Sequence, residues 1–190
     1  MRGLKSGAGA WIAALTLALV VAGGARGAIT VSFYSHGWGM GPHGFIYFPH
    51  AFVVIERTDA AGARASEETY GFTAVGQDPS VLMHPTPGEV IPEDPVYLKK
   101  SILHFTVEAT EAQYQALKAK VAAWAAPGSP LYDLNGHNCI TFVAELAGAL
   151  GLQAPPPTGR DPGRFLEGVR QLNPGRLIGA AADPPGGHGG

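Results

Sequence analysis

The single cysteine, Cys139, limits how this 190-residue chain can be held together. One thiol cannot form an intrachain disulfide, and it cannot supply the thiolates of a multi-cysteine zinc site. Hydrophobic residues make up 46% of the chain and charged residues 15%, which excludes a highly charged disordered chain. The length suits one domain that is large enough to bury its own core. The sequence therefore predicts one globular domain stabilised by apolar packing.

The first 27 residues have the pattern of a secretory signal. Arg2 and Lys5 precede an uncharged apolar run from Trp11 to Ala22, and Ala25-Arg26-Gly27 fits the small-x-small cleavage rule. The apolar run is shorter than the roughly 20 residues of a membrane-spanning helix. We therefore expect cleavage and export to the periplasm or the medium, with no stable membrane span after removal of the signal. An uncleaved membrane anchor is the alternative.

This interpretation divides the chain into a signal peptide at 1–27, a domain at 28–175 and a disordered tail at 176–190, which is rich in Gly, Pro and Ala. Residues 1–27 contain three basic residues and no acid, so the exported part has 10 basic and 15 acidic residues. Without a basic excess, nucleic acid is not an expected partner. A lone cysteine is unusual in an oxidising compartment, so the thiol is either a buried bystander or a group required for chemistry.

Apolar patterns along the domain predict both strands and helices. Strands are expected at Ile29–Tyr34, Ala51–Arg57, Ala65–Phe72 and Ser101–Val107. Helices are expected after the capping box Thr110–Gln113, from Cys139 to Leu150, and after Asp161-Pro162. The proline-rich stretch from Gly76 to Pro95 is expected to be a long surface loop.

Cys139 stands where a turn-rich loop enters a predicted helix. Free backbone N–H groups and the positive end of the helix dipole favour a thiolate there, and the same N–H groups can stabilise an oxyanion. A small buried hydrophobic residue is the competing interpretation. A thiol nucleophile needs a base, which is usually histidine. The candidates are His36, His43, His50, His84, His104, His137 and His188.

Three segments together resemble a known group of enzymes. They are Pro49-His50-Ala51-Phe52-Val53-Val54-Ile55-Glu56, then Tyr70-Gly71, then the run from Tyr132 to Val143 that contains Asn138-Cys139. This order resembles the circularly permuted papain-like thiol hydrolases: permuted NlpC-type peptidases, lecithin:retinol acyltransferase-like proteins and PPPDE peptidase-like proteins. In these families a strand histidine precedes the helix-start cysteine. The resemblance implies an α+β fold in which an antiparallel sheet packs against the cysteine-bearing helix.

The resemblance also implies roles for individual residues. Cys139 would be the nucleophile and His50 the general base and later acid, while Asn138 would order the helix entry. Tyr132 and Tyr70 are possible supporting residues, and Tyr70 fits ordinary strand-end packing equally well. A third polar residue is open.

If the second and third strands pair, Thr69, Tyr70 or Thr73 could orient the histidine, although a register slip of one residue would change the choice. A Cys–His dyad alone is also compatible. The acidic pairs Glu67-Glu68 and Glu93-Asp94 are expected to be solvated surface. Trp38 could contact a substrate or cover the core.

The sequence therefore favours an exported cysteine hydrolase or acyltransferase without a cofactor, acting on an amide or ester bond. Peptide or peptidoglycan substrates come first, with lipid esters as a second class. The alternative is a catalytically inactive binding or scaffold module of the envelope with the same fold. A metal-handling protein is a third possibility because His36, His43 and His50 are spaced by seven residues, but glycines and a proline between them oppose a shared helical face.

Overall fold

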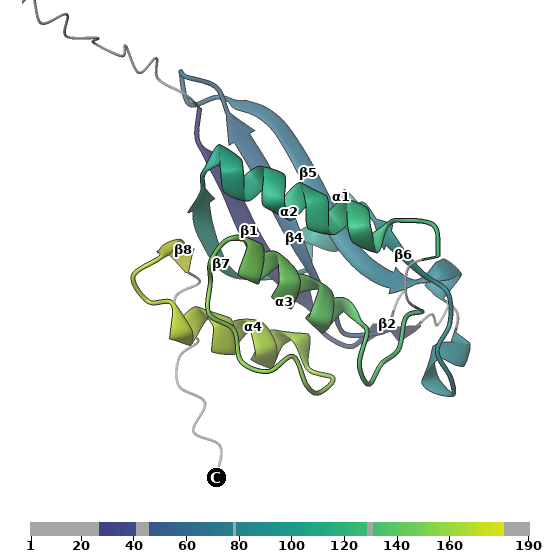
Figure 1. The fold of residues 1–190 in the computed structure, drawn as a ribbon. Coiled ribbons are helices and arrows are strands. Elements are labelled where there is room, and N and C mark those ends of the chain that lie inside the picture. The colour runs from purple at the N-terminus through teal and green to yellow at the C-terminus, as the bar shows by residue number, and fades with distance from the viewer. Residues whose placement is uncertain (1–26, 41–45, 78, 129–130, 181–190) are drawn as a thin grey trace, which may run out of the picture.

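The computed structural model describes residues 27–40, 46–77, 79–128 and 131–180 (Figure 1). In these residues a six-stranded antiparallel sheet has the strand order β6-β5-β4-β1-β7-β8. Its strands are β1 (Ile29–His36), β4 (His50–Thr58), β5 (Arg64–Ala74), β6 (Gly88–Ile91), β7 (Ile102–Ala109) and β8 (Leu177–Ala180). A separate ribbon pairs β2 (Gly39–Met40) with β3 (Ile46–Tyr47). The predicted α+β class with an antiparallel sheet is confirmed.

Three longer helices lie side by side over one face of this sheet (Figure 1). They are α2 (Glu111–Trp124), α3 (Cys139–Ala149) and α4 (Pro162–Leu172). The described residues also contain the short helix α1 (Pro95–Lys99) and 3-10 turns at Val75–Gln77 and Pro79–Leu82. The predicted capping box before α2 is present, since Thr110 and Gln113 satisfy each other's backbone N–H groups. Asp161 caps α4 ahead of Pro162, also as predicted.

The hydrophobic core lies between the sheet and α2, α3 and α4. Leu117, Leu146 and Leu166, one from each of these helices, are fully buried. Burial of such a side chain stabilises the fold by about 1.5–3 kcal/mol relative to exposure. Below them, Phe33 of β1 stacks on Phe105 of β7 with ring centroids 4.7 Å apart. This packing fixes α3, and therefore its first residue, against the sheet.

Two regions contain more regular structure than the sequence predicted. The expected loop from Gly76 to Pro95 includes β6, which pairs with residues 71–74 of β5. The prediction of a disordered tail at 176–190 is wrong for residues 177–180, which form β8 and pair with the outer edge of β7. Each strand has only four residues, and its stability depends on backbone hydrogen bonds to a longer neighbour rather than on its own pattern. Residues 181–190 and the predicted signal, apart from Gly27, lie outside the described residues.

Among the described residues, no helix combines the length and the apolar character that crossing a membrane requires.

Candidate active site

Asn138 caps the N-terminus of helix α3 and orders its first turn, as the sequence predicted. Its side-chain oxygen accepts hydrogen bonds from the backbone N–H groups of Ile140 (2.8 Å) and Thr141 (3.2 Å). The Asn138 backbone N–H in turn donates to Thr141 Oγ1 (2.8 Å), which completes a capping box. The Asn138 amide group also donates to the Leu134 carbonyl (3.0 Å). The residue that follows Asn138 therefore stands at a rigid helix N-terminus.

Cys139 is the first residue of α3, and only 4% of its surface is exposed. Its sulfur is hydrogen-bonded to the His50 ring, to the backbone N–H of Ala51 and to the Tyr132 side chain. The fold thus joins two residues that lie 89 positions apart in the sequence. Both residues were expected site residues, and the structure places an imidazole beside the sulfur rather than aliphatic neighbours alone.

His50 is the first residue of β4, and 12% of its side chain is exposed. It lies directly opposite His36 of β1 and two residues before Phe52, which pairs with Gly71 of β5. Its ring projects over β5, where its Nε2 lies 3.0 Å from Oε1 of Glu93. Because imidazole has two ring nitrogens, this bond leaves Nδ1 as the second hydrogen-bonding atom of the ring.

Glu93 is the site residue that the sequence interpretation missed. The expectation that Glu93 is solvated surface is wrong, because only 5% of its side chain is exposed. It lies between β6 and α1, and its backbone N–H donates to Thr69 Oγ1 (2.7 Å). Thr69 was a candidate for orienting His50, but its hydroxyl binds the backbone of Glu93. Glu93 is the residue that contacts the His50 ring. No sequence signal pointed to Glu93, since its position depends on the unrecognised strand β6.

The Cys139 and His50 charges stabilise each other. Burial lowers the pKa of His50, but hydrogen bonds and charge interactions with Cys139 and Glu93 outweigh burial and raise this pKa to about 10. Burial likewise raises the pKa of the Cys139 thiol, yet the neighbouring His50 and the Ala51 N–H reverse this and lower the pKa below its usual value. Both shifts favour the thiolate–imidazolium pair relative to the neutral pair, with Glu93 behind the imidazolium.

Tyr132 lies on the other side of the sulfur. Two backbone hydrogen bonds with Thr86 (3.0 and 2.7 Å) fix its position, and 7% of the residue is exposed. Its hydroxyl is hydrogen-bonded to the Cys139 sulfur and also accepts the Cys139 backbone N–H. Burial and the adjacent thiolate raise the pKa of Tyr132, so its hydroxyl stays protonated and can donate. Tyr132 is thus a predicted supporting residue that the structure places at the site.

Tyr70, by contrast, does not reach the pair. Successive residues of a strand point to opposite faces, so Tyr70 faces away from the side on which the His50 ring covers Gly71. Its hydroxyl is hydrogen-bonded to Glu68 and Lys118. The expectation that Tyr70 supports the catalytic pair is therefore not met, and its place in a surface network agrees with the packing alternative.

Three of the other described histidines have partners of their own, whereas His36 lies opposite His50 and stacks on Tyr97. The His137 ring stacks on Trp124 with centroids 4.0 Å apart, and His104 Nε2 is 2.8 Å from Ser35 Oγ. His84 contacts its neighbouring backbone, while His43 and His188 lie outside the described residues. Within the described ranges, no group of three or more His, Cys, Asp or Glu side chains could hold a metal ion.

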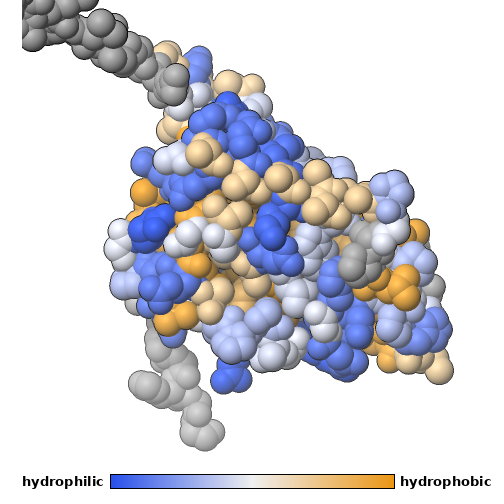
Figure 2. Space-filling view, viewed as in Figure 1, coloured by the Kyte–Doolittle hydropathy of each residue, from blue (hydrophilic) through white to orange (hydrophobic). Residues whose placement is uncertain are grey.

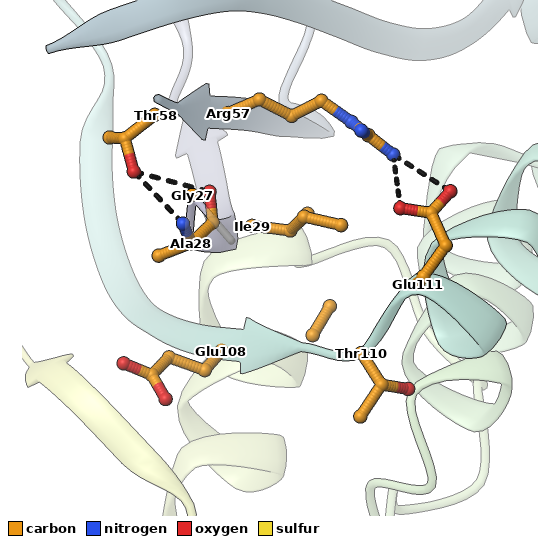
Figure 3. A pocket seen from close by; sticks show the side chains of 9 residues that line it. Gly27, Ala28, Ile29, Arg57, Thr58, Glu108, Thr110 and Glu111 are labelled. Carbon is orange, nitrogen blue, oxygen red and sulfur yellow. Dashed lines mark hydrogen bonds and ion pairs between the residues drawn. The ribbon is translucent and has the colours of Figure 1, made fainter. Parts of the chain in front are cut away.

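A surface pocket of about 650 Å³ lies at the opposite end of β1 and β4 from His50 (Figure 3). Its wall includes the bidentate ion pair of Arg57 with Glu111 and the hydrogen bond from the Ala28 backbone N–H to Thr58 Oγ1 (3.0 Å). It contains neither cysteine nor histidine, so it is distinct from the Cys139 site.

Comparison of the chain with protein-family models, with curated proteins and with solved structures gives no significant match.

Proposed function

We propose that this chain is a thiol hydrolase or acyltransferase that attacks an amide or ester carbonyl through Cys139. One observation carries the proposal: the sole cysteine, at a helix N-terminus, is hydrogen-bonded to a histidine that a buried carboxylate backs. Nucleophile, base and orienting group in this order are the arrangement that covalent acyl transfer needs.

The resting pair supplies the nucleophile. With the imidazolium beside it, the Cys139 thiol has a lowered pKa and gives up its proton more readily than an ordinary thiol. The thiolate attacks the substrate carbonyl carbon, and the C=O π electrons move to the oxygen. Glu93 holds the His50 ring in place and stabilises its positive charge through the 3.0 Å bond to Nε2.

Two donors near the sulfur suit the negative oxygen that forms in this step. They are the backbone N–H of Cys139 and the hydroxyl of Tyr132, which contact each other in the absence of substrate. A carbonyl oxygen entering between them would accept a hydrogen bond from each. Prepositioned donors of this kind are among the largest contributions to acyl-transfer rates.

His50 completes the cycle as an acid and then a base. The His50 proton goes to the leaving amine or alcohol as the tetrahedral intermediate collapses to a thioester on Cys139. The neutral ring then takes a proton from an incoming water or other acceptor, which attacks the thioester. The resulting collapse expels the Cys139 thiolate and regenerates the ion pair.

The resemblance to circularly permuted papain-like enzymes supports this proposal at the level of arrangement. The histidine begins a strand and comes first in the chain, and the Asn-Cys pair begins a helix that packs on an antiparallel sheet. Together with the predicted signal peptide, this favours substrates outside the cytoplasm. Peptide amides, including those of peptidoglycan, and lipid esters are the two classes under consideration.

Trapping of the thioester tests the proposal. The purified protein is mixed with p-nitrophenyl acetate, quenched in acid and measured by intact and peptide mass spectrometry. We expect an acetyl group on Cys139 that forms quickly and disappears on further incubation, and that is absent from Cys139→Ala. Acetylation no faster than in His50→Gln would contradict it and favour an inactive binding module of the same fold.

A further inference from the structure

A second histidine lies beside the catalytic pair. His36, the last residue of β1, is directly opposite His50, the first residue of β4, and their side chains leave the sheet from the same face. The next pair on this face, Tyr34 and Phe52, has stacked rings with centroids 5.5 Å apart. Ser35 points the other way, towards the first turn of α4 on the helix-covered side of the sheet, which is the side in view in Figure 2.

One aromatic ring from α1 packs against both histidines. The Tyr97 ring lies 4.3 Å from the His36 ring and 6.5 Å from the His50 ring, measured between centroids. The Ser101 hydroxyl donates to the Tyr97 carbonyl (3.0 Å), so its contact of 3.4 Å with His36 Nδ1 leaves it only the role of acceptor. This contact favours a proton on Nδ1, and Nε2 is then the nitrogen that must gain a proton for His36 to become charged. Trp38, by contrast, is 69% exposed and does not cover the core.

The charged groups around His36 come from three segments. Burial, and after it the charges of His50 on β4 and of Lys100 at the C-terminus of α1, lowers the pKa of His36 below its ordinary value of 6.5. Glu93, which lies between β6 and α1, opposes this shift. The two contacts from α1 and from the residue before β7, described above, are hydroxyl-bearing side chains. His36 is therefore neutral at neutral pH, whereas His50 carries the positive charge of the site.

The interaction between the two histidines acts in both directions. Because a proton on His50 hinders protonation of His36, a proton on His36 weakens proton binding at His50 by the same free energy. His50 is the cation that lowers the pKa of Cys139. A charged His36 therefore disfavours the His50 imidazolium, and the Cys139 pKa rises in consequence.

We propose that His36 is a positioning residue that acts through His50: its neutral ring leaves the positive charge to His50, and its protonation in acid removes the Cys139 thiolate. This inference rests on the proposed thiol chemistry and concerns the regulation of that chemistry by pH. The site then works at neutral pH, and in acid it loses its nucleophile at a higher pH than it would without His36.

NMR titration of the histidine rings measures the coupling without any substrate. The His36 signals are followed against pH in wild type, in His50→Gln and in His84→Gln, which alters an exposed histidine that contacts the Pro85 carbonyl. Removal of the His50 charge should raise the His36 pKa by about half a pH unit towards its ordinary value. His84→Gln should leave the His36 titration unchanged. A His36 pKa that does not rise in His50→Gln overturns the inference.

Iodoacetamide labelling of Cys139 tests the consequence for the thiol. Near pH 5, His36→Gln should react about threefold faster than wild type, because no second charge forms beside His50, and the two should converge near about pH 7. His36→Lys places a permanent charge there and should react about threefold more slowly than wild type even near pH 7. His84→Gln should follow wild type throughout.

The shape of the labelling profile separates this role from a structural one. A His36→Gln rate that differs from wild type by a constant factor at every pH, or that overlaps wild type throughout, overturns the inference. The His36→Gln comparison does not depend on the stability of His36→Lys. Slow wild-type labelling that is the same in His50→Gln would instead contradict the proposed thiol chemistry itself.

Discussion

Gly71 of β5 lies directly beneath the ring of His50. A Cβ atom at position 71 would overlap both His50 Nε2 and Glu93 Oε1. The 3.0 Å bond between those two atoms therefore depends on a residue without a side chain on the neighbouring strand. Gly71 makes room for the charged part of the site, a role that its backbone conformation alone does not require, since its φ is not positive.

Replacing Gly71 with alanine should separate His50 from Glu93 while leaving the fold intact. Displacement of the ring weakens the ion pair with Cys139, so we expect about a tenfold slower reaction of Cys139 with iodoacetamide at neutral pH. Gly136→Ala, in the loop before Cys139, is the matched control because a Cβ there has open space. Equal rates in the two variants would show that Gly71 has no such role.

Glu93→Gln should weaken the charge of His50. Loss of the carboxylate lowers the His50 pKa, and the weaker imidazolium in turn raises the Cys139 pKa. The pH at which iodoacetamide labelling reaches half its maximum should therefore move upward. Asp94→Asn removes the same charge one residue away and keeps the N-cap of α1, so its profile should match wild type. A Glu93→Gln profile identical to that of Asp94→Asn would contradict the assignment.

Tyr132→Phe should slow acylation more than alkylation. Acylation by p-nitrophenyl acetate passes through an oxyanion, and loss of one donor is expected to slow it by about 100-fold. Alkylation by iodoacetamide forms no oxyanion, so we expect a much smaller change there. Stopped-flow measurement of both rates on one preparation checks this difference. A similar loss in both reactions would mean that Tyr132 acts on the thiolate and not on the substrate oxygen.

Glu68 should stabilise the protein in a pH-dependent way. Burial raises the pKa of Glu68, but hydrogen bonds from Lys118, Tyr70 and Tyr114 outweigh burial and lower the pKa to about 2. Since the pKa is lower in the folded state, this stabilisation is present above pH 4.5 and is lost as the pH falls towards 2. Glu68→Gln should cost about 2 kcal/mol near neutral pH and progressively less in acid, as measured by urea unfolding. Glu67→Gln, on the opposite face of β5, should cost much less.

The sequence was sufficient to predict those parts of the fold that depend on local patterns. Apolar patterns located β1, β4 and β7, and the turn after β4 located β5. The capping residues Thr110 and Asp161 located two helix starts. The meeting of Cys139 and His50 was implied only by the resemblance to permuted papain-like enzymes, because spacing alone did not select His50 among the seven histidines. These elements are long or have a side-chain cap, so their signals lie within a few neighbouring residues.

The remaining features depend on contacts between distant segments. β6 and β8 are stable only because β5 and β7 supply hydrogen bonds, and Glu93 reaches His50 only because β6 carries the chain alongside β5. The assignment of Tyr70 failed for a related reason. The register that pairs Gly71 with Phe52 decides which face each residue of β5 occupies, and no local pattern specifies that register.

The reaction of Cys139 with iodoacetamide as a function of pH tests the central claim most directly. The rate constant is measured in wild type and in His50→Gln from about pH 5 to about pH 9, with labelling assigned by mass spectrometry. His50 holds the Cys139 pKa below its ordinary value of 9.0. Wild type should therefore keep its full labelling rate at pH values below 9, whereas the labelling rate of His50→Gln should fall as the pH drops below 9. Two overlapping profiles, both typical of an ordinary thiol, would contradict the account.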